Sequence, residues 1–241
     1  MFSLLHWLFP ATCQLCGAEG DTTLCPHCLA ALERMPKPIC LYCGSPVAGD
    51  NEDPYHCPAC ARRSRDYDIA RSALTMSSDA LRLIHDLKYH NANHLARAMA
   101  PLLAEVWRET PALCAHDDWV LVPVPILRQR LVQRGYNQAE ELARELSGLT
   151  GNPVAEMLER RETGIISQTR LSADARQGNA RRAYHVRHAY ASGRKHAPAH
   201  LLLIDDVYTT GATARACAAE LKKLPQVEKV GVLTLIRVGT A

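Results

Sequence analysis

Aromatic side chains and long hydrophobic runs are scarce in this 241-residue sequence. Aromatic residues make up only 5% of the chain, so single-stranded nucleic acid would find few rings on which to stack. No stretch approaches the roughly 20 apolar residues of a membrane-spanning helix, and we expect no membrane span. The apolar segment 1–10 has no basic residues ahead of it, so we interpret it as a packing segment and not as a signal peptide. We therefore expect a cytoplasmic protein whose ten cysteines stay reduced.

Positive charge is scarce in the first quarter of the chain. Residues 1–60 contain two basic side chains, Arg34 and Lys37, against six acidic ones, a net charge of −4. A finger that grips nucleic acid should instead present a basic face. Residues 120–200 contain thirteen Lys or Arg against seven acidic residues, a net charge of +6. The later region therefore suits a polyphosphate ligand and leaves room for a nucleic-acid strand.

Eight of the ten cysteines form four C-x-x-C pairs, a spacing typical of zinc knuckles. The order of the pairs predicts two successive zinc ribbons, 13–28 and 40–60, each closing on its own zinc ion. Interleaved pairing, a ligand role for His27 or His56, and redox chemistry are the alternatives. Cys114 and Cys217 stand alone, and we expect both to be buried and inert. The predicted zinc ligands are Cys13, Cys16, Cys25, Cys28, Cys40, Cys43, Cys57 and Cys60.

Residues 201–213 place an apolar run ahead of two acidic residues and a turn rich in hydroxyl groups. The run 201–204 suits a buried parallel strand, with Asp205 and Asp206 at its carboxyl end, where open α/β sheets bind ligands. The turn leads into a helix expected at about 212–223, whose positive end favours a phosphate. This segment resembles the phosphoribosyl pyrophosphate (PRPP) motif of type I phosphoribosyltransferases. There, the paired acids contact the ribose hydroxyls and the loop binds the 5′-phosphate. An ordinary strand, turn and capped helix is the alternative.

A second candidate segment follows a strand expected at 119–124. Its arginines Arg128, Arg130 and Arg134 are expected in a loop, with Asn137 capping a helix over about 137–149. The planar guanidinium fork suits a phosphate, and the position corresponds to the pyrophosphate loop of phosphoribosyltransferases. A solvated basic loop is the alternative.

The polar stretch 160–182 is long and only weakly periodic, as functional lids often are. We expect Gln168, Arg176 and Asn179 to point from this stretch into the site, and an exposed connector is the alternative. Lys88, near the end of a helix expected at about 78–90, is the cation of residues 61–118 that we expect to face the cleft; a surface lysine is the alternative.

Taken together, the sequence resembles the ComF/GntX family of phosphoribosyltransferase-like proteins over nearly its whole length. In naturally competent bacteria, members of this family are needed for transforming DNA to enter the cytoplasm, and others are linked to the use of DNA or gluconate. The resemblance rests on the cysteine ribbons and on these motifs: Leu87-Lys88-Tyr89-His90, Val122-Pro123-Val124-Pro125, Arg134-Gly135-Tyr136-Asn137-Gln138, Gln168-x-x-Leu171, Arg176-x-x-Asn179 and Ile204-Asp205-Asp206-Val207-Tyr208-Thr209-Thr210-Gly211-x-Thr213.

The resemblance implies an α/β fold, with a type I phosphoribosyltransferase-like parallel sheet flanked by helices and a small zinc-ribbon module. We expect the double zinc ribbon at 1–65 and the phosphoribosyltransferase-like domain at 66–241. A last strand is expected at about 229–237. Many type I phosphoribosyltransferases recognise their nucleobase with a hood built from terminal segments, and few residues follow this strand. Here we therefore expect a hood that recognises the acceptor to come from the residues before 119. The implied catalytic residues are Asp205, Asp206 and Arg134. The implied PRPP-binding residues are Asp205, Asp206, Thr209, Thr210, Gly211, Ala212, Thr213, Val124, Pro125, Arg128, Lys88, Gln168 and Arg176.

Three functions are compatible with this resemblance. The first is a phosphoribosyltransferase that binds PRPP with Mg²⁺ and holds structural zinc in two sites. The second is a non-catalytic protein of DNA uptake that keeps the PRPP pocket while its basic surface binds single-stranded DNA. The third is a scaffold whose ribbons bind a DNA-uptake helicase or another competence protein.

Overall fold

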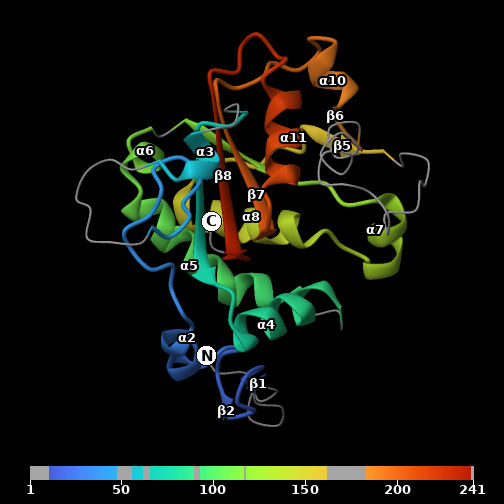
Figure 1. Ribbon diagram of the computed structural model, residues 1–241. Helices are drawn as coiled ribbons and strands as arrows, with labels where there is room; N and C mark the ends of the chain where they lie inside the picture. Colours follow the sequence, from blue (N-terminus) through green and yellow to red (C-terminus); the bar gives the residue numbers. More distant parts are fainter. Residues whose placement is uncertain are drawn as a thin grey trace, which may run out of the picture.

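The computed structural model describes residues 11–47, 56–61, 66–89, 93–116, 118–161 and 183–239. Its centre is a four-stranded sheet whose neighbouring strands are all parallel, in the order β3-β8-β7-β4. Figure 1 shows this sheet with helices around it, which confirms the expected fold class. The strands are β3 (Ile69–Thr75), β4 (Trp119–Pro123), β7 (His200–Tyr208) and β8 (Lys229–Arg237).

Strands β7 and β8 lie in the middle of the sheet and are covered on both faces. In β7, Leu201 and Leu203 belong to one hydrophobic cluster, whereas Leu202 and Ile204 belong to the other. Alternate side chains of a strand point to opposite faces, so a strand covered on both sides needs a continuous apolar run. The observed bounds of β8 match the strand expected from the sequence.

The two faces of the sheet carry different layers. The cluster with Leu202 contains side chains of the long helices α4 (Ser78–Lys88), α5 (Leu95–Glu109) and α8 (Gln138–Thr150), among others. The opposite cluster contains helix α11 (Ala212–Leu221) and the antiparallel pair β5 (Leu158–Arg160) and β6 (Tyr184–Val186). The short helices α6 (Pro111–Cys114), α7 (Arg128–Arg134) and α10 (His188–Ala191) complete this part of the fold.

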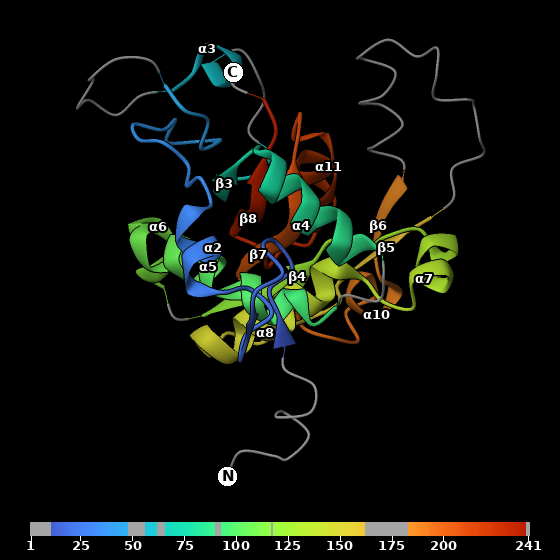
Figure 2. The ribbon, with the colours of Figure 1, turned by 90° about the horizontal axis from the view of Figure 1, so that it is seen from below.

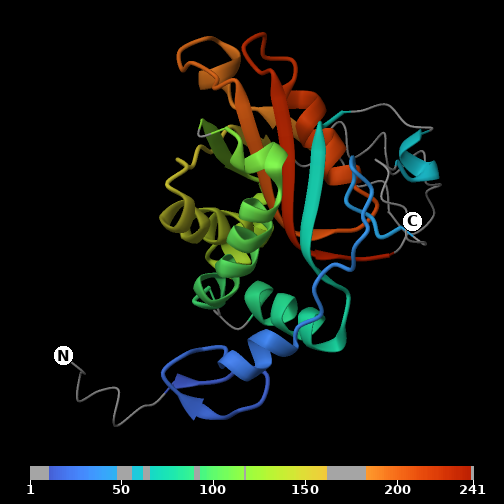
Figure 3. The ribbon, with the colours of Figure 1, turned by 90° about the vertical axis from the view of Figure 1, so that its left-hand side faces the viewer.

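The two zinc ribbons lie at different places on the sheet domain. The first contains β1 (Ala11–Thr12), β2 (Glu19–Gly20) and α2 (Pro26–Ala31), and its buried side chains join the α4–α5 cluster. The second contains α3 (Pro58–Ala61), and its buried side chains join the α11 cluster. Figures 2 and 3 show the first ribbon in dark blue near α4, and α3 in light blue near the C-terminus.

The linker between the ribbons and Tyr42 of the second ribbon cover the outer edge of β3. Thr75 N donates to Glu33 O at 3.0 Å, Met35 N to Ala73 O at 3.1 Å, and Ala70 N to Tyr42 O at 2.7 Å. An edge strand with unpaired backbone groups invites unwanted pairing, and these bonds remove that hazard. Sequence analysis placed the first core strand at 119–124 and missed β3, because its pairing partners are distant in the sequence.

Three local expectations were wrong. Strand β7 is longer than the run 201–204: it continues to Tyr208, so Asp205 and Asp206 are part of its carboxyl end and do not follow its last residue. The arginine segment forms helix α7, which ends at the left-handed Gly135 (φ 79°), and not a loop. Cys114 is exposed, because α6 presents it to solvent, whereas Cys217 is fully buried as expected.

In the part of the chain that the structure describes, no helix is both long and apolar enough to span a membrane. The expected lid residues Gln168, Arg176 and Asn179 lie outside the described residues, and their roles stay predictions.

Candidate functional site

Two groups of four cysteines form the metal centres. Within each group, the sulfur atoms lie within 4.8 Å of one another, so each ribbon closes on itself and interleaved pairing is excluded. Tetrahedral Zn–S bonds of about 2.3 Å place the sulfur atoms about 3.8 Å apart. The Cys16–Cys25 and Cys43–Cys57 sulfur distances are 3.8 and 3.7 Å. Both donor sets therefore fit structural zinc, and the exposed His27 and His56 belong to neither group.

Backbone N–H groups prepare one thiol in each ribbon for metal binding. Burial alone would raise the pKa of Cys13, but backbone N–H groups, including that of Cys25, outweigh burial and lower the pKa to about 6. The same balance lowers the pKa of Cys40 to about 6, with Cys57 among its backbone donors. Zinc binds the thiolate form, so Cys13 and Cys40 are the thiols that these backbone groups prepare for the metal.

A third group of potential ligands contains His116, Asp118 and His200. His200 Nδ1 lies 2.7 Å from Asp118 Oδ1, and Lys229 Nζ lies 2.9 Å from His116 Nε2. A lysine ammonium this close would repel a metal cation, so we assign no metal here.

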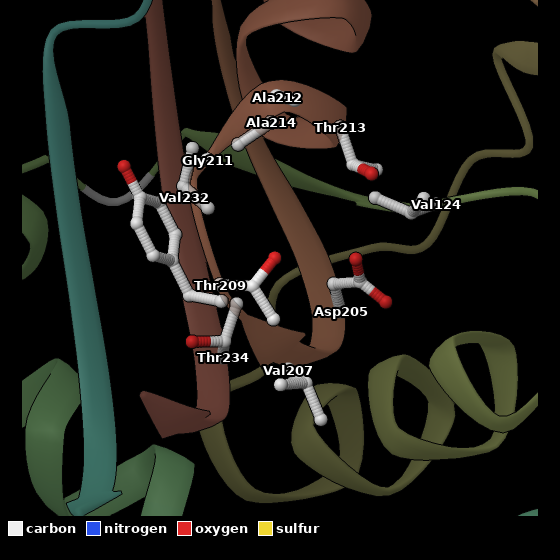
Figure 4. Close-up of a pocket in the computed structure, with 11 residues that line it drawn as sticks. Val124, Asp205, Val207, Thr209, Gly211, Ala212, Thr213, Ala214, Val232 and Thr234 are labelled. Carbon is white, nitrogen blue, oxygen red and sulfur yellow. The ribbon is translucent and has the colours of Figure 1, made fainter. Parts of the chain in front are cut away.

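The loop after β7 and the start of α11 surround a cavity of about 40 Å³. Figure 4 shows Asp205 and Thr213 facing this space, with Val124 beside them. Six residues expected to bind PRPP line it, namely Val124, Asp205, Thr209, Gly211, Ala212 and Thr213. The fold therefore collects about half of the predicted set around one cavity at the carboxyl end of the sheet.

The loop closes tightly because of Gly211. Its φ of 71° lies in the left-handed region, and a Cβ there would stand 2.2 Å from Tyr208 Oη. Helix α11 begins directly after this glycine with no side-chain cap hydrogen bond. Ala212 N, the first N–H of the helix, donates to Thr210 Oγ1 at 3.4 Å. The next N–H groups of the first turn keep the positive end of the helix available to an anion.

The two neighbouring acids have different surroundings. Burial raises the pKa of Asp205 well above its usual range, and the charge of Asp206 raises it further. Asp206 is only 5% exposed and pairs with Lys88, whose Nζ lies 2.6 Å from Asp206 Oδ2. The ammonium neutralises one acid, so the pair presents less repulsion to an incoming anion. Lys88 of α4 therefore reaches the acid pair of β7, and its role in ligand binding stays a prediction.

Arg134 and the end of α4 meet beside this ion pair. The Arg134 guanidinium lies 5.1 Å from the centre of the Tyr89 ring, and its Nη1 donates to Gln138 Oε1 at 3.0 Å. Tyr136 Oη donates to Leu87 O at 2.6 Å, one residue before Lys88. These contacts hold the end of α4 against the turn between α7 and α8.

Other predicted residues lie apart from the cavity around Asp205. Pro125 and Arg128 line a second cavity, of about 180 Å³, together with Glu140, Glu156 and Arg187. Thr210 faces a third cavity, on the side of the second ribbon. The structure therefore separates the predicted set into several neighbouring sites.

Sequence analysis missed two buried arginines that line this third cavity, Arg215 and Arg237. The sequence signal that could have found them is a charged residue within an otherwise apolar segment. Arg215 interrupts a run of small residues in α11, and Arg237 ends the apolar strand β8.

Comparison with known proteins gives matches along the chain. Residues 4–61 match the double zinc ribbon domain. The chain is 29% identical to the DNA utilization protein YhgH of Escherichia coli K12 over 215 residues, which cover 87% of this chain and 89% of that protein. It is 29% identical to competence protein F of Haemophilus influenzae over 218 residues, 89% of this chain and 90% of that protein. It is 25% identical to competence protein ComFC of Bacillus subtilis over 224 residues, 91% of this chain and 86% of that protein.

These matches confirm the resemblance drawn from the motifs: the chain is a homologue of competence protein F and DNA utilization protein YhgH, and it carries a double zinc ribbon domain.

Proposed function

We propose that the protein binds PRPP at the carboxyl end of β7 and acts in DNA uptake or utilisation. One observation carries the PRPP part. Asp205, the loop at Thr209 and the first turn of α11 surround a single cavity. A carboxylate that accepts from a diol, next to a helix start that favours phosphate, matches the two ends of a ribose 5-phosphate.

Each part of the ligand would meet a different group. The ribose hydroxyls donate to Asp205, whereas Asp206 is already paired with the Lys88 ammonium. The 5′-phosphate accepts from the backbone and hydroxyls of the loop and first turn at 209–213. The diphosphate, accompanied by Mg²⁺, lies toward Lys88 and Arg134, where the acid pair and the turn before α8 meet.

The role in DNA uptake or utilisation rests on the names of the relatives, competence protein F and DNA utilization protein.

Direct binding of single-stranded DNA is a second candidate function, favoured by helix α7. Arg128 and Arg130 are exposed on this helix, and residues 120–200 carry a net charge of +6. Exposed arginines contact a phosphate backbone without reading sequence.

Calorimetry with PRPP and Mg²⁺ tests the first proposal. Asp205→Asn combined with Asp206→Asn removes the charged acceptors, so we expect affinity to fall by about 1–3 kcal/mol for each lost bond. The matched control is Asp79→Asn, an exposed acid in the first turn of α4, which should leave the affinity unchanged. Unchanged affinity in the folded double variant would refute the assignment.

Titration of a labelled oligonucleotide tests the second candidate. Arg128→Ala with Arg130→Ala should weaken binding at low salt, and salt should weaken binding to the unmodified protein through counterion release. Arg108→Ala, an exposed arginine of α5, is the control. Saturating PRPP should compete, because Arg134 of α7 belongs to the proposed diphosphate side. Salt-sensitive DNA binding that PRPP does not weaken would mean that DNA binds at a site separate from the PRPP site.

A further inference from the structure

The largest of the cavities described here lies between the second zinc ribbon and the sheet and has a volume of about 370 Å³. We call it the ribbon cavity. It is separate from the cavity around Asp205, but both are lined by Tyr208 and Thr209, so they are neighbours across these two residues. The remaining lining residues are Tyr42, Cys43, Cys57, Ala59, Cys60, Tyr67, Thr210, Arg215, Arg237, Val238 and Gly239. Its volume lies within the roughly 300–1,000 Å³ typical of small-molecule sites.

Two arginines give the ribbon cavity its charge. Arg215 and Arg237 are 7% and 8% exposed, and no carboxylate of the described residues lies within ion-pair distance of either. Arg215 Nη1 donates to Thr210 O at 3.0 Å, and Arg237 Nη1 donates to Cys43 O at 2.8 Å. The Nε atom of each arginine is buried without a hydrogen-bond partner. A buried charged donor without a partner is costly, so each of these groups calls for an acceptor.

The zinc site balances only one of these charges. Arg237 Nη2 lies 3.6 Å from Cys43 Sγ, next to a tetrathiolate zinc centre with a net charge of about −2. Among the described residues, no thiolate is recorded in contact with Arg215, and no Asp or Glu lines the ribbon cavity. This imbalance favours an anionic ligand beside Arg215.

The walls of the ribbon cavity are aromatic and fixed in place. Tyr67 Oη and Tyr208 Oη lie 2.6 Å apart, and the Tyr42 and Tyr67 rings stack with centroids 4.6 Å apart. The Arg237 guanidinium lies 4.4 Å from the centre of the Tyr208 ring. Such walls favour a flat, largely apolar ligand body, while the Arg215 guanidinium, which lines the cavity and pairs with no carboxylate of the described residues, favours a carboxylate on it.

We propose that the ribbon cavity binds a small aromatic carboxylate, with Arg215 as its anion partner and the second ribbon as its wall. This site is distinct from the PRPP site, and it binds its ligand without PRPP. Because the two cavities share Tyr208 and Thr209, occupation of one should change the affinity of the other.

Benzoate and nicotinate, titrated by protein-detected NMR without PRPP, test this proposal. We expect saturable binding of the acids at millimolar concentrations or below, and at least about tenfold weaker binding of benzamide and nicotinamide. Arg215→Gln should weaken the acids at least about tenfold and leave the amides unchanged. Arg194→Gln, an exposed arginine, is the matched control.

Two further measurements keep the test decisive if Arg215→Gln disturbs the loop. Zinc content and melting temperature report whether the variant is folded. Ala59→Leu fills the ribbon cavity from the exposed side of α3 without changing a charge, and should reduce binding of the acids. No binding of the acids at 10 mM, or equal binding of acids and amides, would overturn the proposal. PRPP binding that survives in Arg215→Gln would leave the PRPP proposal intact.

Discussion

The two zinc ribbons have the same ligand spacing but different surroundings. In the second ribbon, three of the four cysteines are buried, and Cys43 is held through its carbonyl oxygen by the buried Arg237. In the first ribbon, Cys16 is exposed, and an exposed contact joins the ribbon to α4, from Arg82 Nη1 to Leu15 O at 3.2 Å. The same motif therefore forms a peripheral module in the first ribbon and a wall of the ribbon cavity in the second.

This difference shows that the C-x-x-C pattern predicts the metal but not the role of the ribbon. The second ribbon contacts two strands of the central sheet: β3, through its backbone, and the end of β8, through Arg237. The first packs on the cluster of α4 and α5, and α4 ends at Lys88, which pairs with Asp206. Substitutions in the second ribbon should therefore disturb the sheet and the proposed site, whereas substitutions in the first should disturb mainly the ribbon itself.

Loss of a zinc ligand should give the largest difference. We expect Cys43→Ser to lower the free energy of unfolding by more than about 3 kcal/mol, because zinc binding and local folding are coupled. Cys16→Ser should cost less, about 1–2 kcal/mol, because its position is exposed and the other ligands stay in place. Denaturant unfolding measures both, and the unmodified protein should contain about two zinc ions per chain. Equal losses in the two variants would break the comparison.

Removal of the arginine that ties each ribbon to the rest of the protein should give the next largest effect. Arg237→Met leaves Cys43 O without its buried charged donor, so we expect a loss of about 2–3 kcal/mol. Arg82→Met removes only an exposed contact and should cost less than about 0.5 kcal/mol. Thermal unfolding of both variants is the measurement. A larger loss for Arg82→Met would contradict the assignment of the tighter attachment to the second ribbon.

A matched pair of glycines probes the same difference on a smaller scale. Gly17 and Gly44 both have left-handed backbones, with φ of 73° and 71°. A Cβ on Gly17 meets nothing within 4 Å, whereas a Cβ on Gly44 would stand 2.6 Å from Ala70 O of β3. Gly17→Ala should therefore cost about 1 kcal/mol from backbone strain alone, and Gly44→Ala should cost about 1 kcal/mol more. Equal costs would mean that the second ribbon does not press against β3.

The pH dependence of the proposed site should give the smallest effect. Because the pKa of Asp205 is raised in the folded chain, its contribution to stability is fully present below the usual carboxyl pKa of about 3.9 and is lost as the pH rises through the raised value. PRPP affinity should rise over the same window, since the ionised carboxylate is the better acceptor. Calorimetry across this window should show a flatter dependence for Asp205→Asn and an unchanged one for Cys16→Ser. The same slope in Asp205→Asn would assign the titration to another group.

The sequence predicted the features that depend on local pattern. The spacing of the cysteines gave both zinc sites, and the apolar run before Asp205 gave the central strand. The features that it missed depend on contacts between distant segments. β3 is a strand because it pairs with β8 and with the ribbon linker. The ribbon cavity exists because the second ribbon folds back over Arg215 and Arg237, and no local pattern shows this return.

Hydrogen exchange with and without PRPP and Mg²⁺ tests the central claim, that PRPP binds at the end of β7, most directly. We predict slower exchange in peptides that cover residues 205–214, where the loop and the first turn of α11 would hold the ligand. Peptides from the first ribbon, residues 11–31, should exchange at the same rate in both conditions. Protection confined to the first ribbon, or no protection at 205–214 at saturating PRPP, would contradict the account.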